Sequence, residues 1–402
     1  MKKVFIVSAK RTAVGKFLGS LTNFTAPELA AEVIKNIISE TKIDPSKIDE
    51  VIVGNVLSAG QKQGVARQCA IKGGIPDTVS AYSINMVCGS GLKAINNAYT
   101  SIIAGQSELI LAGGTETMSG AVYLLPPTVR TGVKMGDFNI IDHMIIDGLT
   151  DAFNNYHMGI TAENVAEKYD ISREEQDEFS YSSQIKAMKA QDEGKFDNEI
   201  VTIEIVAKKE TTIFNKDEFI NRTTSPEKLA KLKPAFKKDG TVTAGNASGI
   251  NDGASFVLVA SEDAVKKYNL KPLVEIIAIG QGGVPPEIMG VGPVPAVDNA
   301  LKNANLKLSE IDIFELNEAF AAQSLAVMKL LTEEHKVDKK FFQERANKNG
   351  GAIALGHPIG ASGNRITVSL IHEMKRKNNN LGLASLCIGG GMGVAIILKN
   401  VN

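Results

Sequence analysis

The sequence predicts an α/β protein in which helices cover both faces of a mostly parallel sheet. Residues 1–120 alternate short apolar runs, at 4–7, 51–53 and 109–112, with stretches of helical apolar spacing. Such alternation is typical of strands joined by crossover helices. Residues 272–402 return to the same pattern. We therefore expect two α/β halves within one chain.

The segment between the two halves has a different character. Residues 121–245 contain shorter apolar runs and more charged and turn residues. This composition predicts a loop domain inserted on the α/β core, where substrate-binding loops are commonly found. The expected division is a first half formed by residues 1–120 with 246–271, an inserted loop domain at 121–245, and a second half at 272–402.

The two halves also resemble each other in sequence. The matching pairs are residues 46–55 with 309–318, 89–93 with 361–365, and 109–114 with 383–390. Each match is short, but all three occur in the same order and at nearly constant separation, which favours an internal duplication. If a pseudo-twofold axis relates the halves, the ends of their sheets should meet at one cleft.

Composition and charge limit the possible partners. The 402 residues carry a net charge of −1, contain no Trp, and are 5% aromatic. The chain therefore lacks a basic field for nucleic acid or an anionic membrane, and it lacks a stacking platform for single strands. No run of 18 apolar residues occurs, so we expect no membrane span.

The three cysteines, Cys69, Cys88 and Cys387, are far apart, and neither a CxxC pair nor histidines at ligand spacing accompany them. This pattern excludes a disulfide scaffold and argues against a metal site. It indicates a reducing compartment, so we expect a cytoplasmic protein, or a matrix protein whose leader has been removed. Cys69 lies in a helical pattern and is expected to be structural.

Cys88 is the first candidate for chemistry. The β-compatible run 83–87 leads directly into it, Gly89 and Gly91 follow, and a helical apolar spacing begins at Leu92. A strand, a tight turn with a nucleophile and a helix N-terminus form a nucleophile elbow. We expect the helix N-terminus to lower the pKa of the thiol. A buried structural cysteine is the alternative.

Further candidates lie at predicted strand ends of the second half. Asn317 follows the apolar run 313–316, and His357 lies in a glycine-rich turn before a helix. Cys387 ends a β run and precedes three glycines. Histidine is the usual activator of a cysteine nucleophile, although a lone histidine is more often structural. The glycines do not form a dinucleotide-binding fingerprint, because too few residues follow them for a βαβ unit.

These motifs together resemble the thiolase family, in particular its biosynthetic acetoacetyl-CoA type. The resemblance covers essentially the whole chain, and it is carried by residues 85–91, 245–253, 317–320, 356–358 and 387–389. It implies an α/β thiolase fold with two similar five-stranded mixed-sheet halves in a layered αβαβα arrangement, and with an inserted loop domain.

The resemblance also implies an activity, the reversible condensation of two acetyl-CoA molecules to acetoacetyl-CoA and CoA. Cys88 would attack the first acetyl-CoA while His357 takes its proton, and Cys387 would deprotonate the second acetyl-CoA. Asn317 would hold a water that faces the enolate oxygen. The backbone N–H groups of Cys88 and Gly389 would stabilise the tetrahedral intermediate.

A further set of residues is implied to bind the substrate. It consists of Ser248, Leu149, His157, Met158, Arg222, Phe236, Ala244, Met289, Ala319 and Phe320. The sequence departs from the family pattern at Asn221, where relatives carry an arginine for the CoA nucleotide. Either the next residue, Arg222, substitutes for it, or the nucleotide is held less tightly.

The resemblance implies no separate cofactor, because coenzyme A is part of the substrate, and it implies a homotetramer. The apolar stretch 121–127 within the polar insertion supports an interface. Three alternatives stay open. One is a degradative 3-ketoacyl-CoA thiolase for longer chains, the second is a ketoacyl synthase, and the third is a non-catalytic protein that binds CoA or RNA.

Overall fold

The computed structural model describes residues 2–206 and 210–401, and one large mixed sheet runs through it. The strand order is β13-β14-β15-β12-β1-β11-β5-β3-β4. The first half supplies β1 (Val4–Thr12), β3 (Glu50–Gly54), β4 (Ser80–Ile84), β5 (Leu109–Thr117) and β11 (Asn251–Ser261). The second half supplies β12 (Val274–Gly283), β13 (Ile313–Leu316), β14 (Leu381–Ile388) and β15 (Met392–Asn400).

The two halves join in the middle of this sheet. There β1 runs antiparallel to β12, with Phe5 opposite Glu275 and Ile6 opposite Val274. In the first half, β3 pairs in parallel with β4 and β5, and β5 pairs antiparallel with β11. In the second half, β13 pairs in parallel with β14, and β14 pairs antiparallel with β15. In the second half, none of the described strands takes the position beside β13 that β4 takes beside β3. A single parallel bridge between Phe314 and Ala346 lies there instead.

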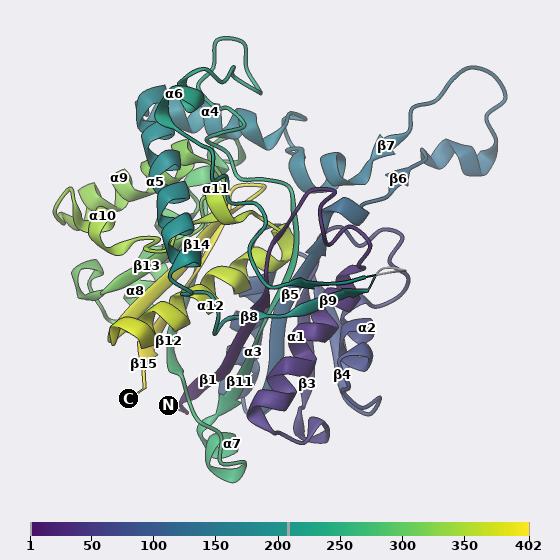
Figure 1. The fold of residues 1–402 in the computed structure, drawn as a ribbon, viewed down its shortest axis with the longest axis vertical. Helices are drawn as coiled ribbons and strands as arrows, with labels where there is room; N and C mark the ends of the chain where they lie inside the picture. Colours follow the sequence, from purple (N-terminus) through teal and green to yellow (C-terminus); the bar gives the residue numbers. More distant parts are fainter. Residues whose placement is uncertain (1, 207–209, 402) are drawn as a thin grey trace.

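Helices arrange the molecule in five layers (Figure 1). On the outer side of the first half lie α1 (Ala26–Thr41) and α2 (Val65–Lys72), and on the outer side of the second half lie α8 (Pro293–Ala304) and α9 (Ala321–His335). Between the halves, α3 (Ser90–Ile103) packs against α12 (Ile359–Lys377). Separate apolar clusters fill the two outer interfaces and the central one. The expected αβαβα layering is confirmed, although the second half has four of the five expected strands in the described part of the chain.

The remaining elements are short or belong to loops. The helices are α4 (Met158–Lys168), α5 (Arg173–Asp192), α6 (Pro226–Ala230), α7 (Glu262–Lys267), α10 (Phe341–Arg345) and α11 (Ala352–Leu355). The strands are β2 (Gly15–Lys16), β6 (Tyr123–Leu124), β7 (Ile141–Asp142), β8 (Ile200–Val201), β9 (Ile203–Val206) and β10 (Thr211–Phe214). The single turns are η1 (Pro45–Lys47), η2 (Met118–Gly120), η3 (Pro127–Thr131), η4 (Met144–Leu149), η5 (Pro286–Val291) and η6 (Leu308–Glu310).

The internal repeat is visible in the details of both halves. Asp49, before β3, accepts hydrogen bonds from the backbone N–H groups of residues 108 and 109. Asp312, before β13, accepts them from residues 380 and 381 in the same way. The first strand of each half also has a register shift at the equivalent place, between Ile6 and Ser8 in β1 and between Ile276 and Ala278 in β12.

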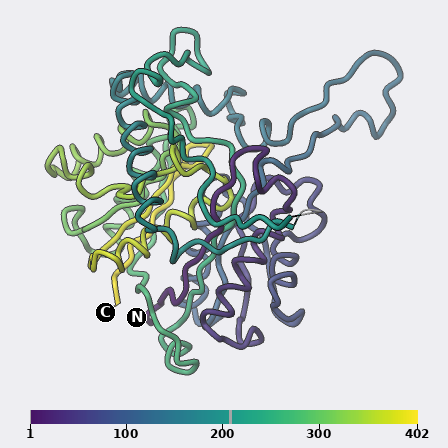
Figure 2. The backbone as a smooth tube through the Cα atoms, viewed as in Figure 1, coloured from purple at the N-terminus to yellow at the C-terminus, as the bar shows by residue number. Residues whose placement is uncertain are grey.

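The insertion contributes α4, α5 and α6, which sit over one end of the sheets, and an arm that projects away from the body (Figure 2). The arm comprises residues 121–142 and contains β6, η3 and β7. Its exposed apolar side chains are Tyr123, Leu125, Val133, Met135, Phe138, Ile140 and Ile141. Within residues 2–206 and 210–401, none of the helices has the length and apolar character needed to span a bilayer.

We expect Asp49→Ala and Asp312→Ala each to lower the free energy of unfolding by about 1–3 kcal/mol, because each leaves two backbone N–H groups without their acceptor. Denaturation in urea, followed by circular dichroism, measures the effect. Asp137→Ala, in the exposed arm, is the control. A loss of stability in only one of the two variants would contradict the structural equivalence of the halves.

Candidate active site

Cys88 lies in a strained turn between β4 and α3. The preceding residue, Val87, has a φ of 45°, a left-handed conformation that is a genuine outlier for a β-branched side chain. Ser90 closes the turn, because its Oγ accepts from the N–H of Met86 at 2.8 Å and donates to the carbonyl of Val87 at 2.7 Å. The predicted elbow is therefore present, and local hydrogen bonds hold its strain.

Three further groups share a cavity with Cys88. The cavity has a volume of about 830 Å³, and Cys88, His357, Cys387 and Gly389 line it together. They come from the turn after β4, the loop before α12, and the end of β14. These are carboxyl ends of strands and an adjoining loop, where α/β sheets place their ligands. The sequence-based expectation that the two halves meet at one cleft agrees with this arrangement.

The hydrogen bonds of His357 identify its free nitrogen. Its Nδ1 lies 2.6 Å from Oγ of Ser362, and that hydroxyl donates to the carbonyl of Pro358 at 2.9 Å. Because the single hydroxyl proton goes to the carbonyl, Oγ accepts from Nδ1–H. The lone pair of the neutral ring is then on Nε2, which is buried and has no protein partner among the described residues. Nε2 is therefore available as a base.

Burial also keeps the His357 ring neutral. Burial, together with the positive charge of Arg365, lowers the pKa of His357 to about 3. The N–H of His357 donates to Oδ1 of Asn251 at 2.9 Å, which fixes the glycine-rich loop on β11. The imidazole is therefore preorganised as an unprotonated proton acceptor at neutral pH.

The expected lowering of the Cys88 pKa is not found. Burial raises the pKa of Cys88 to about 11, although the backbone N–H groups of Gly389 and Cys88 itself act in the opposite direction. Cys88 packs on apolar side chains from distant segments, including Leu57, Met144 and Ile359. Their desolvation of a thiolate outweighs the helix N-terminus. In the free protein Cys88 is a neutral thiol, and its deprotonation must be coupled to attack.

The second thiol is even more strongly desolvated. Burial raises the pKa of Cys387, and the neighbouring Cys88 raises it further. Cys387 sits at the end of β14 within an apolar cluster that includes Met158, Met289 and Phe320. Once formed, a thiolate with a raised pKa is a strong base, which suits removal of a proton from carbon.

Asn317 is buried at the end of β13 and does not itself line the cavity. Its N–H donates to the carbonyl of Ser385 at 3.0 Å, two residues before Cys387. Its Oδ1 accepts from Nη2 of Arg365 at 3.4 Å, whereas its Nδ2 has no protein partner in the described part of the chain. Asn317 thus keeps a free donor next to the strand that carries Cys387.

Nine of the ten expected substrate-binding residues line the cavity. They are Ser248, Leu149, His157, Met158, Phe236, Ala244, Met289, Ala319 and Phe320. His157 stacks on Phe236 with 4.6 Å between ring centroids. Its Nδ1 accepts from the N–H of Gly159 at 3.0 Å, so the proton of the neutral ring is on Nε2.

Arg222 lies outside this set. Its guanidinium pairs with Asp192 at 2.7 Å on the surface and also contacts Gln191. Asn221 and Lys16 line the cavity instead. Sequence reasoning missed Lys16, because it follows a short glycine turn far from the recognised motifs. It also missed Glu116, a carboxylate within the otherwise apolar and small residues of β5.

Glu116 connects the two halves at the site. Its carboxylate accepts from the N–H groups of Val56, Leu57 and Gly360, and from Nδ2 of Asn55. Burial raises its pKa to about 7. Gly360 is in the first turn of α12, so this carboxylate joins the loop after β3 to the helix that follows His357. The only signal in the sequence is a charged residue in a buried strand.

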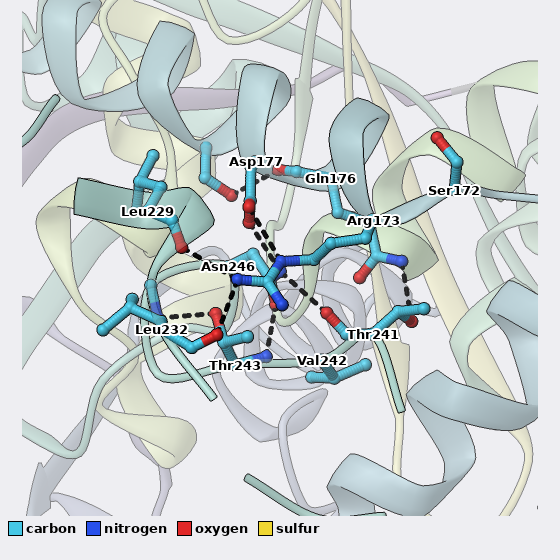
Figure 3. Close-up of polar contacts among 12 residues, drawn as sticks. Ser172, Arg173, Gln176, Asp177, Leu229, Leu232, Thr241, Val242, Thr243 and Asn246 are labelled. Atoms are coloured by element: carbon cyan, nitrogen blue, oxygen red, sulfur yellow. Dashed lines mark hydrogen bonds and ion pairs between the residues drawn. The ribbon is translucent and has the colours of Figure 1, made fainter. Parts of the chain in front are cut away.

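The loop that carries Ser248 is anchored on α5 (Figure 3). Asn246 donates from Nδ2 to Asp177 at 3.0 Å, and Arg173 donates from Nε to the same carboxylate at 2.7 Å. Arg173 also donates to the carbonyls of Leu229 and Leu232, each at 2.8 Å. One arginine and one aspartate thus hold two cavity-lining loops in place.

No group of three or more His, Cys, Asp or Glu side chains within residues 2–206 and 210–401 is arranged to hold a metal ion. The site instead offers two thiols, an unprotonated imidazole nitrogen and backbone N–H donors around one cavity. These are the groups that covalent nucleophilic catalysis by cysteine needs, because a base activates the thiol and N–H donors stabilise an oxyanion.

Comparison with known proteins agrees with the fold and the site. Residues 4–263 match the thiolase N-terminal domain and residues 270–400 the thiolase C-terminal domain. A probable acetyl-CoA acyltransferase of Staphylococcus aureus (strain COL) is 54% identical over 400 residues, which cover 99% of each chain. The crystal structure of the Bacillus anthracis acetyl-CoA acetyltransferase has a TM-score of 0.94 at 43% identity, covering 100% of this chain and 99% of that one.

A third similar structure is the human mitochondrial 3-ketoacyl-CoA thiolase in complex with CoA. It has a TM-score of 0.93 at 45% identity and covers 100% of this chain and 98% of that one. The chain therefore belongs to the thiolase family. Within that family it is an acyltransferase enzyme.

In the free protein we expect alkylation of Cys88 by iodoacetamide to accelerate about tenfold per pH unit between about pH 7 and about pH 10, because only the thiolate reacts. Burial raises its pKa to about 11, so the rate should not level off near pH 8.5 as for a free cysteine. Peptide mass spectrometry measures the rate, and the buried Cys69 serves as an internal reference. A plateau below about pH 8.5 would show that the turn stabilises the thiolate.

Proposed function

We propose that this enzyme is an acetyl-CoA C-acetyltransferase, which condenses two acetyl-CoA molecules reversibly to acetoacetyl-CoA and CoA. The observation that carries the proposal is the convergence of Cys88, Cys387 and the unpartnered Nε2 of His357 on one cavity. One thiol can carry an acyl group while the second acts on the incoming substrate. Because the acyl group stays on one thiol while the first product leaves, the two thiols support a ping-pong reaction.

In the first half-reaction, Cys88 attacks the carbonyl carbon of acetyl-CoA, and Nε2 of His357 takes the thiol proton. The oxyanion forms where the N–H groups of Cys88 and Gly389 converge on the sulfur of the nucleophile. Removal of one such donor typically lowers the rate by ~10²–10³. The intermediate collapses to acetyl-Cys88, and the departing CoA thiolate receives the proton from His357.

In the second half-reaction, Cys387 first passes its thiol proton to Nε2 of His357, and the resulting thiolate removes a proton from the methyl carbon of a second acetyl-CoA. The enolate oxygen is stabilised by the Nε2–H that His357 then carries and by a water held by the free Nδ2 of Asn317. The enolate carbon then attacks acetyl-Cys88, and the carbon–sulfur bond to Cys88 breaks. Cys387 keeps the proton taken from carbon, and His357 returns its proton to the departing Cys88 thiolate, so atoms and charges balance over the cycle.

The alternative is a degradative 3-ketoacyl-CoA thiolase with longer substrates. Its support is the similarity to the human 3-ketoacyl-CoA thiolase, which matches as closely as the acetyl-CoA acetyltransferase. The stacked rings of His157 and Phe236, together with Met158 in the apolar cluster around Cys387, support the short-chain reaction, because they take up space near the second thiol.

Thiolysis of a substrate series separates the two activities. We expect kcat/KM for acetoacetyl-CoA to exceed that for a C8–C10 3-ketoacyl-CoA by at least ~10-fold, because each misfitting methylene group costs a factor of this size. Acid quench after acetyl-CoA exposure should place the acetyl group on Cys88 by peptide mapping, with Cys88→Ala as the control. A preference for the longer substrate would support the degradative activity, and acetylation of Cys387 instead of Cys88 would reverse the assigned roles.

The partners follow from the same proposal. Acetyl-CoA, acetoacetyl-CoA and CoA are the ligands, and we propose neither a separate cofactor nor a nucleic-acid or membrane partner. A cytoplasmic location fits the cysteine usage of the sequence. The mouth of the cavity carries Lys16 rather than Arg222, so Lys16 is the better placed cation for the phosphates of CoA.

We also propose that the enzyme is a homotetramer, a dimer of dimers held together by the arm at 121–142. The arm exposes Tyr123 by 69% and Met135 by 94%, and exposed apolar groups gathered in this way mark interfaces. Sedimentation of the protein with Tyr123→Glu and Met135→Glu should show dimers where the unchanged protein shows tetramers. Val206→Glu, which places the same charge on another exposed apolar residue, is the control. An unchanged protein that sediments as a monomer at micromolar concentration would overturn the proposal.

A further inference from the structure

One face of α12 contacts both groups that have a free buried nitrogen at the site. Ser362 and Arg365 lie three residues apart on this helix and therefore on one face. Ser362 holds Nδ1 of His357, and Arg365 donates to Oδ1 of Asn317. The role of Ser362 follows from the tautomer of His357. The role of Arg365 has no counterpart in the reaction steps above.

The surroundings of Arg365 are unfavourable for a residue that serves only stability. The side chain is 1% exposed, and Nη2 has Asn317 as its acceptor, whereas Nε and Nη1 have no protein acceptor among the described residues. Glu315 is the acidic residue that most strongly raises the pKa of Arg365, but the ion pairs among the described residues do not include Arg365. A buried cation that is incompletely paired is often less stable than an apolar residue of similar size.

Arg365 does, however, determine the orientation of the Asn317 amide. A side-chain amide has an oxygen acceptor at one end and an NH₂ donor at the other, and it can turn over about its last torsion. A guanidinium has donors only. A turned amide would place its NH₂ group against the donors of Arg365, so Oδ1 is held toward the arginine and Nδ2 is held away from it.

Glu315 contributes to the same arrangement. It lies two residues before Asn317 on β13, so the two side chains are on the same face of the strand. Its ionised form favours the protonated guanidinium of Arg365, but burial raises the pKa of Glu315 to about 8, so at neutral pH this carboxyl supplies only part of a counter-charge. Further away, Glu199 and Asp217 are already paired with Arg11. The cation is therefore held between one strand face and one helix face, next to Asn317.

We propose that Arg365 is a positioning residue for the second half-reaction, in which its donors fix the amide of Asn317 so that Nδ2 holds the water that faces the enolate oxygen. The inference rests on the proposed role of Asn317. It assigns no contact between Arg365 and the substrate, because Arg365 does not line the cavity. The first half-reaction uses the N–H groups of Cys88 and Gly389, so it does not depend on the orientation of Asn317.

Two variants distinguish a role in positioning Asn317 from a role in stability alone. Arg365→Met fills the space without a donor, so Asn317 can turn, whereas Arg365→Lys keeps a donors-only group and should retain part of the function. For Arg365→Met we expect condensation to slow about 10- to 100-fold, less than the ~10²–10³ typical of losing an oxyanion donor outright. Arg376→Lys, on the same helix but paired with Glu373, is the matched control.

The two half-reactions are measured separately. Release of CoA in a single turnover with acetyl-CoA reports acetylation of Cys88, and its rate should stay within about twofold of the unchanged protein because it does not use Asn317. Condensation should show the full loss, with Arg365→Lys between Arg365→Met and the unchanged protein. Equal losses in both half-reactions, or losses that follow the melting temperature, would overturn the proposal.

Combination with Asn317→Ala supplies a second criterion. If Arg365 acts through Asn317, then adding Arg365→Met to Asn317→Ala should change the condensation rate by less than about twofold, because the interaction is already lost. Independent, multiplying effects would overturn the inference. If the unchanged protein cleaves only longer 3-ketoacyl-CoA substrates, the proposed function fails, and the same comparisons made in thiolysis of those substrates still decide the role of Arg365.

Discussion

The contact between α3 and α12 is the constraint on which the rest of the structure depends. These helices carry Cys88 and His357 at their N-terminal ends, and they approach so closely that neither can have a side chain at the crossing. A Cβ atom on Gly91 would lie 2.8 Å from the backbone N of Asn364, and one on Gly363 would lie 2.6 Å from the backbone N of Leu92. The two glycines are equivalent in the internal repeat, so a symmetric contact brings an asymmetric pair of catalytic groups together.

The site formed in this way is largely dry, and its chemistry follows from that. Burial keeps His357 unprotonated and both Cys88 and Cys387 protonated. Charge therefore does not accumulate before substrate arrives. It develops during proton transfer, next to backbone N–H groups at Cys88 and Gly389 and near Nδ2 of Asn317, which has no other partner in the described protein. Preorganisation of this kind avoids reorganisation at the moment of reaction.

Local sequence signals were enough to predict the fold and the identity of the main candidates. Cys88 and Cys387 each lie in a glycine-rich turn at a strand end, and such turns are visible without knowledge of the rest of the chain. His357 was expected at a strand end as well, but its glycine-rich turn lies between α11 and α12. The paired apolar and acidic segments at 46–55 and 309–318 likewise indicated the repeat, and the structure gives both the same hydrogen bonds.

Properties that arise between distant segments could not be predicted in the same way. The pKa of Cys88 was expected to be lowered by its helix, but apolar groups from other segments raise it. Nothing in the sequence near Arg365 indicates its role, because that role depends on how α12 packs over β13. Arg222 was expected near the substrate, but its neighbour Asp192 on α5 holds it at the surface.

The pairing of β1 with β12 has a consequence for synthesis of the chain. β1 is made first, yet it ends between β11 and β12, whose residues 251–283 are made much later. The first half therefore cannot complete its sheet while the ribosome is still adding the insertion. During that interval β1 and β5 have unpaired edges, which are sites for wrong association. Contacts between such distant residues also slow folding. In a nascent chain of this protein, the first strands thus keep unpaired edges until more than half of its length has emerged.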